Sequence, residues 1–189
     1  MVQKRKGGAS LVILSGAVIR SYIRRKQLVV SPISKETVQC NGLDLSLGHE
    51  VARLRPCSSI LDTRCHTIPE EYYTKEKAPS FVIHPHECIL TCTKEKLGLP
   101  DDIVGFVNLR STYARLGLLS PCGFIEAGFN GQLTVEMTGG HFPVRIHTGE
   151  RIFHVVFMQL SNRSRSTYKG RYQNQVGVTL PILDGQKRC

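Results

Sequence analysis

The chain has 189 residues and a formal net charge of +10, from 25 Lys and Arg against 15 Asp and Glu. This length suits one domain with a buried core, and nothing in it requires a second domain. The positive charge favours a partner rich in phosphate, either a free nucleotide or a nucleic acid. Specific nucleic-acid binding is not expected, because Trp is absent and zinc-finger, helix-turn-helix and RNA-recognition signatures are missing.

Basic side chains near the N-terminus precede an apolar run at residues 9–19, a pattern that imitates a signal peptide. No small-x-small cleavage site follows, and no apolar run approaches the length that spans a bilayer. We therefore interpret residues 1–10 as a basic N-terminal extension and expect no membrane partner.

The seven cysteines are odd in number and irregularly spaced, unlike the framework of a secreted disulfide-rich protein. A reducing, cytoplasmic location is therefore expected. One local disulfide stays open as an alternative, between Cys57 and Cys65, because such a pair closes a short loop.

A short strand at residues 11–14 is predicted to lead into a helix that is capped by Ser15 and ends near residue 27. Short strand-like runs then recur between Gly and Pro signals. They cover residues 28–30, 42–48, 81–84, 88–92, 103–109, 132–137, 144–147, 152–160 and 177–180. The fold class is therefore mainly β, a distorted β-barrel or jelly roll with a short N-terminal helix.

Two polar stretches are predicted to lie outside the regular strands. Residues 56–79 are irregular in pattern, so we expect a long surface excursion. Residues 161–175 are basic and polar, as in an arm that orders only over a ligand. The expected organisation is an extension at 1–10, a β-barrel domain at 11–160 and a C-terminal arm at 161–189.

His84, His86 and Cys88 alternate along the sequence and would share one face of a strand with Cys92. Alone, this pattern suggests zinc. No second pair with finger-like spacing follows, and the motif of the zinc deaminases is missing, so we interpret these as structural residues and predict no metal bound by the protein itself. Asp44 is likewise interpreted as structural, paired with an arginine across a subunit interface, because a buried carboxylate needs a partner.

The strongest functional signal is the cationic run Arg110-Ser111-Thr112-Tyr113-Ala114-Arg115. Guanidinium and hydroxyl groups bind phosphate oxygens, and a nearby carboxylate can activate a water molecule. Two carboxylates follow, Glu126 and Glu136. This combination suits an enzyme that acts on a nucleoside triphosphate.

Glu126 is predicted to end a strand that leads into a tight hairpin, in which Gly128 and Gly131 allow positive φ. Phe129 is either an ordinary hairpin aromatic residue or a platform for a sugar ring that leaves no room for a 2′-hydroxyl. Alternation places Glu136 on the face opposite Val135. Solvent exposure is the ordinary outcome there, whereas a pocket shared with an arginine would keep the carboxylate charged for proton transfer.

Several motifs, in order, resemble one family. They include Asn41-Gly42-Leu43-Asp44-Leu45, Arg110-Ser111-Thr112-Tyr113-Ala114-Arg115-Leu116-Gly117-Leu118, Glu126-Ala127-Gly128-Phe129 and Tyr168-Lys169-Gly170-Arg171-Tyr172-Gln173-Asn174-Gln175. From Ile13 onward the chain resembles the dCTP deaminase and dUTPase superfamily, most closely its archaeal dUTPase branch. The resemblance implies a homotrimer with shared active sites, dUTP or dCTP as substrate, and Mg²⁺ carried in by the triphosphate.

The resemblance also assigns roles to residues. Catalysis would involve Glu126, Glu136, Arg115 and Ser111. Nucleotide binding would involve Arg110, Ser111, Thr112, Arg115, Phe129, Thr134, Val135, Tyr168, Arg171 and Gln175. Phe129 would stack under the deoxyribose, and the arm would close through Arg171 and Gln175.

Two reactions follow from these roles. In a dUTP diphosphatase, which we expect first, the carboxylate of Glu126 orients a water for attack on the α-phosphorus, releasing dUMP and pyrophosphate. In a dCTP deaminase, the alternative, Glu136 activates a water for attack at C4 of cytosine. A catalytically weak nucleotide-binding regulator is the third hypothesis.

The dUTPase and bifunctional members of the family normally carry Asp where Glu126 stands. Because of this departure, the hypothesis of a catalytically weak regulator is retained. The extra methylene moves the carboxylate by about 1 Å, and a shift of that size can cost about 100-fold in rate. The stretch between Arg115 and Gly123 is short relative to bacterial deaminases, which counts against deamination.

Overall fold

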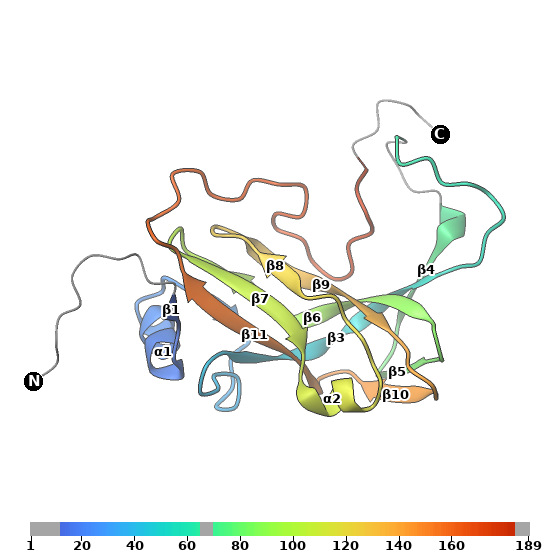
Figure 1. Ribbon diagram of the computed structural model, residues 1–189, viewed down its shortest axis with the longest axis horizontal. Coiled ribbons are helices and arrows are strands. Elements are labelled where there is room, and N and C mark those ends of the chain that lie inside the picture. The colour runs from blue at the N-terminus through green and yellow to red at the C-terminus, as the bar shows by residue number, and fades with distance from the viewer. Residues whose placement is uncertain (1–11, 65–69, 184–189) are drawn as a thin grey trace, which may run out of the picture.

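The structure, a computed structural model, describes residues 12–64 and 70–183 (Figure 1). Its main feature is a strongly curled antiparallel sheet of nine strands, with a separate two-stranded sheet at one end. The predicted fold class, mainly β and barrel-like, is confirmed. The strands are β1 (Val12–Ile13), β2 (Val29–Ser31), β3 (Leu43–Leu54), β4 (Tyr73–Lys77), β5 (Ser80–Ile83), β6 (Cys88–Gly98), β7 (Ile103–Leu109), β8 (Gly123–Ile125), β9 (Asn130–Thr138), β10 (Val144–His147) and β11 (Arg151–Gln159).

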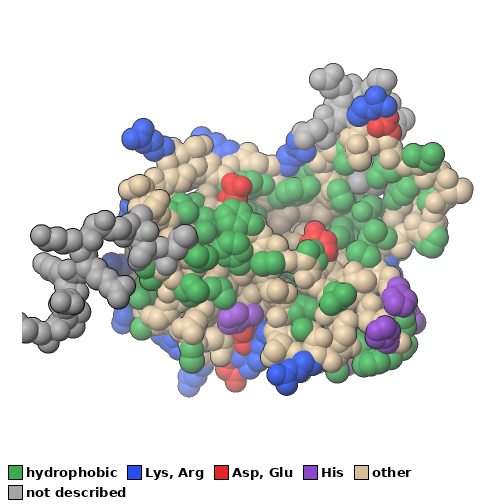
Figure 2. Space-filling model, in the orientation of Figure 1, with side chains coloured by type: hydrophobic (Ala, Val, Ile, Leu, Met, Phe, Trp, Pro, Cys, Tyr) green, Lys and Arg blue, Asp and Glu red, His purple; other side chains and the backbone are tan. Residues whose placement is uncertain are grey.

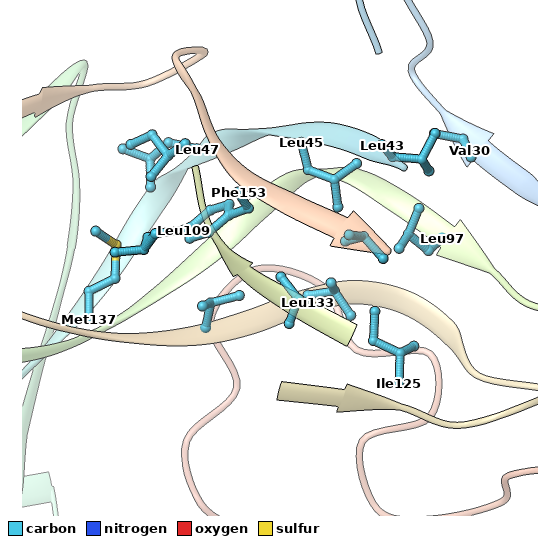
Figure 3. Packing of buried hydrophobic residues seen from close by; sticks show 14 of the residues in the cluster. Val30, Leu43, Leu45, Leu47, Leu97, Leu109, Ile125, Leu133, Met137 and Phe153 are labelled. Atoms are coloured by element: carbon cyan, nitrogen blue, oxygen red, sulfur yellow. The ribbon is translucent and has the colours of Figure 1, made fainter. Parts of the chain in front are cut away.

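The long path through the sheet runs β2-β6-β3-β11-β7-β8. Three strands pair off this path: β1 with β11, β4 with β3, and β9 with β6, while β5 and β10 form the small sheet. The core lies inside the curl, where Leu45, Leu97, Leu133 and Phe153 pack together (Figure 3). Each comes from a different strand, so burial of one apolar face per strand closes the sheet on itself.

Helix α1 (Gly16–Arg24) packs on this body through Ile19, which is fully buried. Ser15 occupies the N-cap position, as predicted, although its side chain makes no capping hydrogen bond. The helix ends earlier than expected, and Lys26 reverses the chain with φ +57°. No helix of the described chain is long and apolar enough to cross a membrane. The predicted extension at 1–10 lies outside the described residues.

The prediction of a surface excursion over residues 56–79 was partly wrong. A 3₁₀ turn (Glu70–Tyr72) leads into β4, which pairs with the second half of β3 from Glu50 to Leu54. Cys57 is an exposed free thiol, and Cys65 lies outside the described residues. The predicted strand at 177–180 was also wrong, because that segment is irregular.

His84, His86 and Cys88, which alternate along the sequence, do not lie on one strand. β5 ends at Ile83, and the chain turns with His86 at φ +61° before β6 begins at Cys88. The carboxylate of Glu87 accepts the backbone N–H of His84 at 2.8 Å and so stabilises the turn. Within the described ranges, no group of three His, Cys, Asp or Glu is arranged to hold a metal ion.

Candidate active site

A cavity of about 400 Å³ opens between β8, β9 and the C-terminal arm. It is lined by Leu90, Val107, Gly123, Phe124, Ile125, Glu126, Phe129, Leu133, Thr134, Glu136, Tyr168, Tyr172, Gln175, Thr179 and Pro181. Figure 2 shows apolar side chains gathered on this face, interrupted by isolated acidic ones. Both candidate carboxylates therefore reach one mainly apolar cavity, the usual setting for a small-molecule site.

Glu126 follows the last residue of β8 and begins a tight turn. The backbone N–H of Phe129 donates to the carbonyl of Glu126 at 3.1 Å, and Gly128 has φ +84°, as the third residue of a type II turn requires. The predicted turn is confirmed, but the predicted hairpin is wrong, because β8 pairs with β7 and β9 pairs with β6. The turn therefore connects two separate parts of the sheet. Glu126 lies at the end that follows β8, and Phe129 lies at the end that leads into β9.

We expect Gly128→Ala to lower the free energy of unfolding by about 2–3 kcal/mol, because a positive φ and overpacking act together. A Cβ at Gly128 would lie 2.5 Å from Cβ of Thr167 in the arm. Gly149→Ala is the matched control, since Gly149 has φ +88° but no atom within 4 Å of its ideal Cβ. It should cost about 1 kcal/mol from φ alone. Equal urea midpoints for the two variants would contradict the packing of the arm on this turn.

Glu136 lies on β9 with its side chain exposed to the cavity, opposite the buried Val135, as alternation predicted. Its register partner on β6 is Leu90, and Thr134 lies on the same face of β9. Beyond Glu136, Thr138 exchanges backbone hydrogen bonds with Leu119, which draws the segment after α2 along the end of the strand. Pairing of β9 with β6 fixes the backbone from which this carboxylate projects.

The predicted phosphate-binding residues lie outside this cavity. They belong to a short helix, α2 (Ser111–Arg115), where Ser111, Thr112 and Arg115 are exposed. Tyr113 packs against the core, and burial, with help from the Glu150 carboxylate, raises the pKa of its hydroxyl. This anchor points the hydroxyls and the Arg115 guanidinium outward.

Arg110, just before α2, is held by Asp44. Nε of Arg110 lies 2.9 Å from Oδ2 of Asp44, whose side chain is only 4% exposed. Arg151 lies 3.5 Å from the same oxygen, and Nδ1 of His154 lies 2.8 Å from Oδ1. Pairing of Asp44 with arginine is confirmed. Both arginines belong to the same chain, so the carboxylate does not need the expected partner across a subunit interface.

The C-terminal arm runs beside β9 and passes above β8 and β9 in Figure 1. The N–H of Gln132 donates to the carbonyl of Gln175 at 3.0 Å, and the N–H of Thr179 donates to Oγ1 of Thr134 at 3.1 Å. Tyr168 reaches the cavity with its ring centroid 6.0 Å from that of Phe129. The arm therefore supplies one wall of the site.

Gln175 has an amide nitrogen that donates to the carbonyl of Gln132 at 2.7 Å. Its Oε1 is buried and has no hydrogen-bond partner among the described residues. Buried polar atoms are normally paired, so this unpaired acceptor is an exception within the arm.

The structure thus gathers six predicted residues in the cavity: Glu126, Phe129, Thr134, Glu136, Tyr168 and Gln175. It leaves Arg110, Ser111, Thr112, Arg115 and the buried Val135 outside the lining, as it does Arg171, whose guanidinium donates to the carbonyl of Ile182. Tyr172 was missed as a lining residue, although it stands in the same arm motif as Tyr168. Thr179, four residues beyond that motif, was missed as well.

Comparison with known proteins places the chain in a family. The model of the dCTP deaminase-like family matches residues 13–160. A dCTP deaminase of Metallosphaera sedula is 40% identical over 170 residues, 90% of this chain and 98% of its own. A probable deoxyuridine 5′-triphosphate nucleotidohydrolase of Sulfolobus islandicus rod-shaped virus 1 is 41% identical over 173 residues, 92% of this chain and 100% of its own.

Among solved structures, the 2′-deoxycytidine 5′-triphosphate deaminase from Agrobacterium tumefaciens superposes with a TM-score of 0.63 at 22% identity. The match covers 78% of this chain and 46% of that longer one, and it supports the fold. The fold, the family match and the full-length relatives agree. The chain belongs to the dCTP deaminase-like family.

Proposed function

We propose that the protein acts on a pyrimidine deoxynucleoside triphosphate and that its first reaction is the deamination of dCTP through Glu136. The observation that carries this proposal is the carboxylate of Glu136, which projects from the paired strand β9 and lines the cavity. Glu136 would accept a proton from water as the oxygen attacks C4 of cytosine, and would pass that proton to the departing ammonia. Full-length relatives named dCTP deaminase move this reaction ahead of the hydrolysis that the sequence led us to expect.

Hydrolysis of dUTP through Glu126 is the second candidate. Glu126 lines the same cavity beside Phe129, and the viral relative carries a nucleotidohydrolase name. The Mg²⁺ ion that this reaction is expected to need would arrive on the triphosphate. When bound, that ion would neutralise charge on the phosphates while Glu126 orients the attacking water.

A single chain does not complete the site. Among the described residues that line the cavity, the charged ones are Glu126 and Glu136, both acidic. A triphosphate needs cations, and the exposed hydroxyls and guanidinium of α2 lie apart from the cavity. We therefore propose a homotrimer in which α2 of one subunit supplies Ser111, Thr112 and Arg115 to the cavity of the next.

Product analysis by chromatography tests the function. The protein is incubated with Mg²⁺ and either dCTP or dUTP. Conversion of dCTP to dUTP supports deamination, and conversion of dUTP to dUMP and pyrophosphate supports hydrolysis. Binding of both nucleotides without any product would favour the catalytically weak regulator.

Mixing inactive subunits tests the shared site. Glu136→Gln and Arg115→Ala should each be inactive alone. When equal amounts are unfolded and refolded together, about a quarter of the sites should combine an intact Glu136 with a neighbour's intact Arg115 and recover activity.

The matched control mixes Glu136→Gln with Gln175→Ala. Both residues line the cavity of one chain, so this mixture should stay inactive. Recovery in the control, or none in the first mixture, would contradict the proposed sharing.

A further inference from the structure

The side-chain amide of Gln173 pairs with backbone groups beside the turn that begins at Glu126, where no neighbouring strand of the described chain pairs with them. Its Oε1 accepts the N–H of Asn130 at 2.9 Å, and its Nε2 donates to the carbonyl of Gly128 at 2.9 Å. These two backbone groups flank Phe129. The amide therefore pairs with this segment as a residue of an adjacent strand would.

The same amide also ties this turn to the arm. Nε2 of Gln173 lies 3.2 Å from the carbonyl of Tyr168, so one NH₂ group serves Gly128 and Tyr168 together. Tyr168 in turn donates its backbone N–H to Ala127 at 2.9 Å. The two rings that face the cavity, Phe129 and Tyr168, thus have their backbones joined through one side chain.

Among side chains of similar size, the amide of Gln173 has both the acceptor and the donors that the three backbone groups require. The N–H of Asn130 requires an acceptor, and the carbonyls of Gly128 and Tyr168 require donors, so Gln173 must supply both at once. Glu in its place would keep the acceptor but set a second oxygen against two carbonyl oxygens. Asn would fall short by one methylene.

We propose that Gln173 is a positioning residue for selectivity between deoxyribose and ribose. It fixes the aromatic wall formed by Phe129 and Tyr168 against the sugar, so that a 2′-hydroxyl has no room. This inference rests on the proposed function, since it takes the substrate to be a deoxynucleoside triphosphate. Gln173 does not line the cavity, so it acts through the two rings and takes no part in the chemical step.

Gln173→Glu tests the proposal with little change of shape. The ratio of kcat/KM for dCTP over CTP should fall about tenfold, the size expected for loss of one hydrogen-bonded positioning contact. Most of the change should come from improved use of CTP, and kcat for dCTP should stay close to that of the parent because Glu136 is untouched. If dUTP is the substrate, the same ratio is measured for dUTP over UTP.

Hydrogen exchange gives a readout that does not depend on activity. In Gln173→Glu the backbone amides of residues 126–131 should exchange faster, whereas those of β7 should be unchanged. Lys169→Ala is the matched control, since Lys169 is an exposed residue of the same arm, and it should change neither the exchange nor the sugar ratio.

The outcomes separate the two hypotheses. If the parent protein turns over neither nucleotide, the proposed function fails, while the exchange experiment still shows whether the amide holds the turn. If the parent is active and Gln173→Glu leaves the sugar ratio unchanged, selectivity does not depend on Gln173 and the inference is overturned. Unchanged exchange at residues 126–131 would overturn it as well.

Discussion

Replacement of Glu136 by Gln is expected to reduce dCTP deamination by a factor of about 10²–10⁴, because the amide cannot accept the proton of the attacking water. The side chain is exposed to the cavity on a strand whose buried face is formed by Leu133, Val135 and Met137. The variant should therefore fold with an unchanged melting temperature. Initial rates of dUTP formation from dCTP measure the loss.

Glu126→Gln is the matched control, because Glu126 is the other acidic residue lining the same cavity. If the two carboxylates serve different reactions, this variant keeps deamination and loses dUTP hydrolysis. Near-parental deamination by Glu136→Gln would refute the role of Glu136 and return Glu126 to first place.

Asp44→Asn should lower the free energy of unfolding by about 2 kcal/mol and weaken nucleotide binding at the same time. The buried carboxylate bonds to Arg110 at 2.9 Å, to His154 at 2.8 Å and more distantly to Arg151. Hydrogen bonds to a charged group contribute about 1.5–3 kcal/mol. The estimate stays in the lower half of that range because the arginines are 33% and 31% exposed, so water replaces part of the lost interaction.

Urea unfolding should reveal the change as a lower midpoint with the same slope. Asp62→Asn is the control, since Asp62 pairs at 2.9 Å with Arg64 on an exposed segment, and no measurable change is expected there. A stability loss in Asp44→Asn with undiminished nucleotide affinity would mean that Asp44 holds the fold but does not position Arg110 for phosphate.

The strands that could be predicted from the sequence are those with plain alternation between clear turn signals. The bounds of β7 and β10 were predicted correctly. β4 was missed because its Lys75, Glu76 and Lys77 resemble a solvated loop, and only their pairing with the long β3 makes them a strand. The hairpin at Glu126 was wrong because β8 and β9 follow closely in sequence but pair with different neighbours.

Part of the lining of the cavity was predictable residue by residue, but its arrangement was not. Family motifs pointed to Phe129, Glu136 and Gln175, and the cavity contains all three. The separation of this cavity from α2 depends on the curl of the whole sheet, which no local pattern encodes. Gln173 carried no signal of its own, because its role appears only when the arm lies beside the turn at Gly128.

The acidic lining of the cavity has a consequence for how activity would depend on the amount of protein. Among the described residues, the cavity of a chain on its own presents two carboxylates and no cation to the phosphates of the substrate. If the cations come from a neighbouring copy, specific activity must fall on dilution, as subunits separate. Newly made chains would then remain inert towards the nucleotide pool until their concentration passes the threshold for assembly, so the amount of enzyme would itself set when turnover begins.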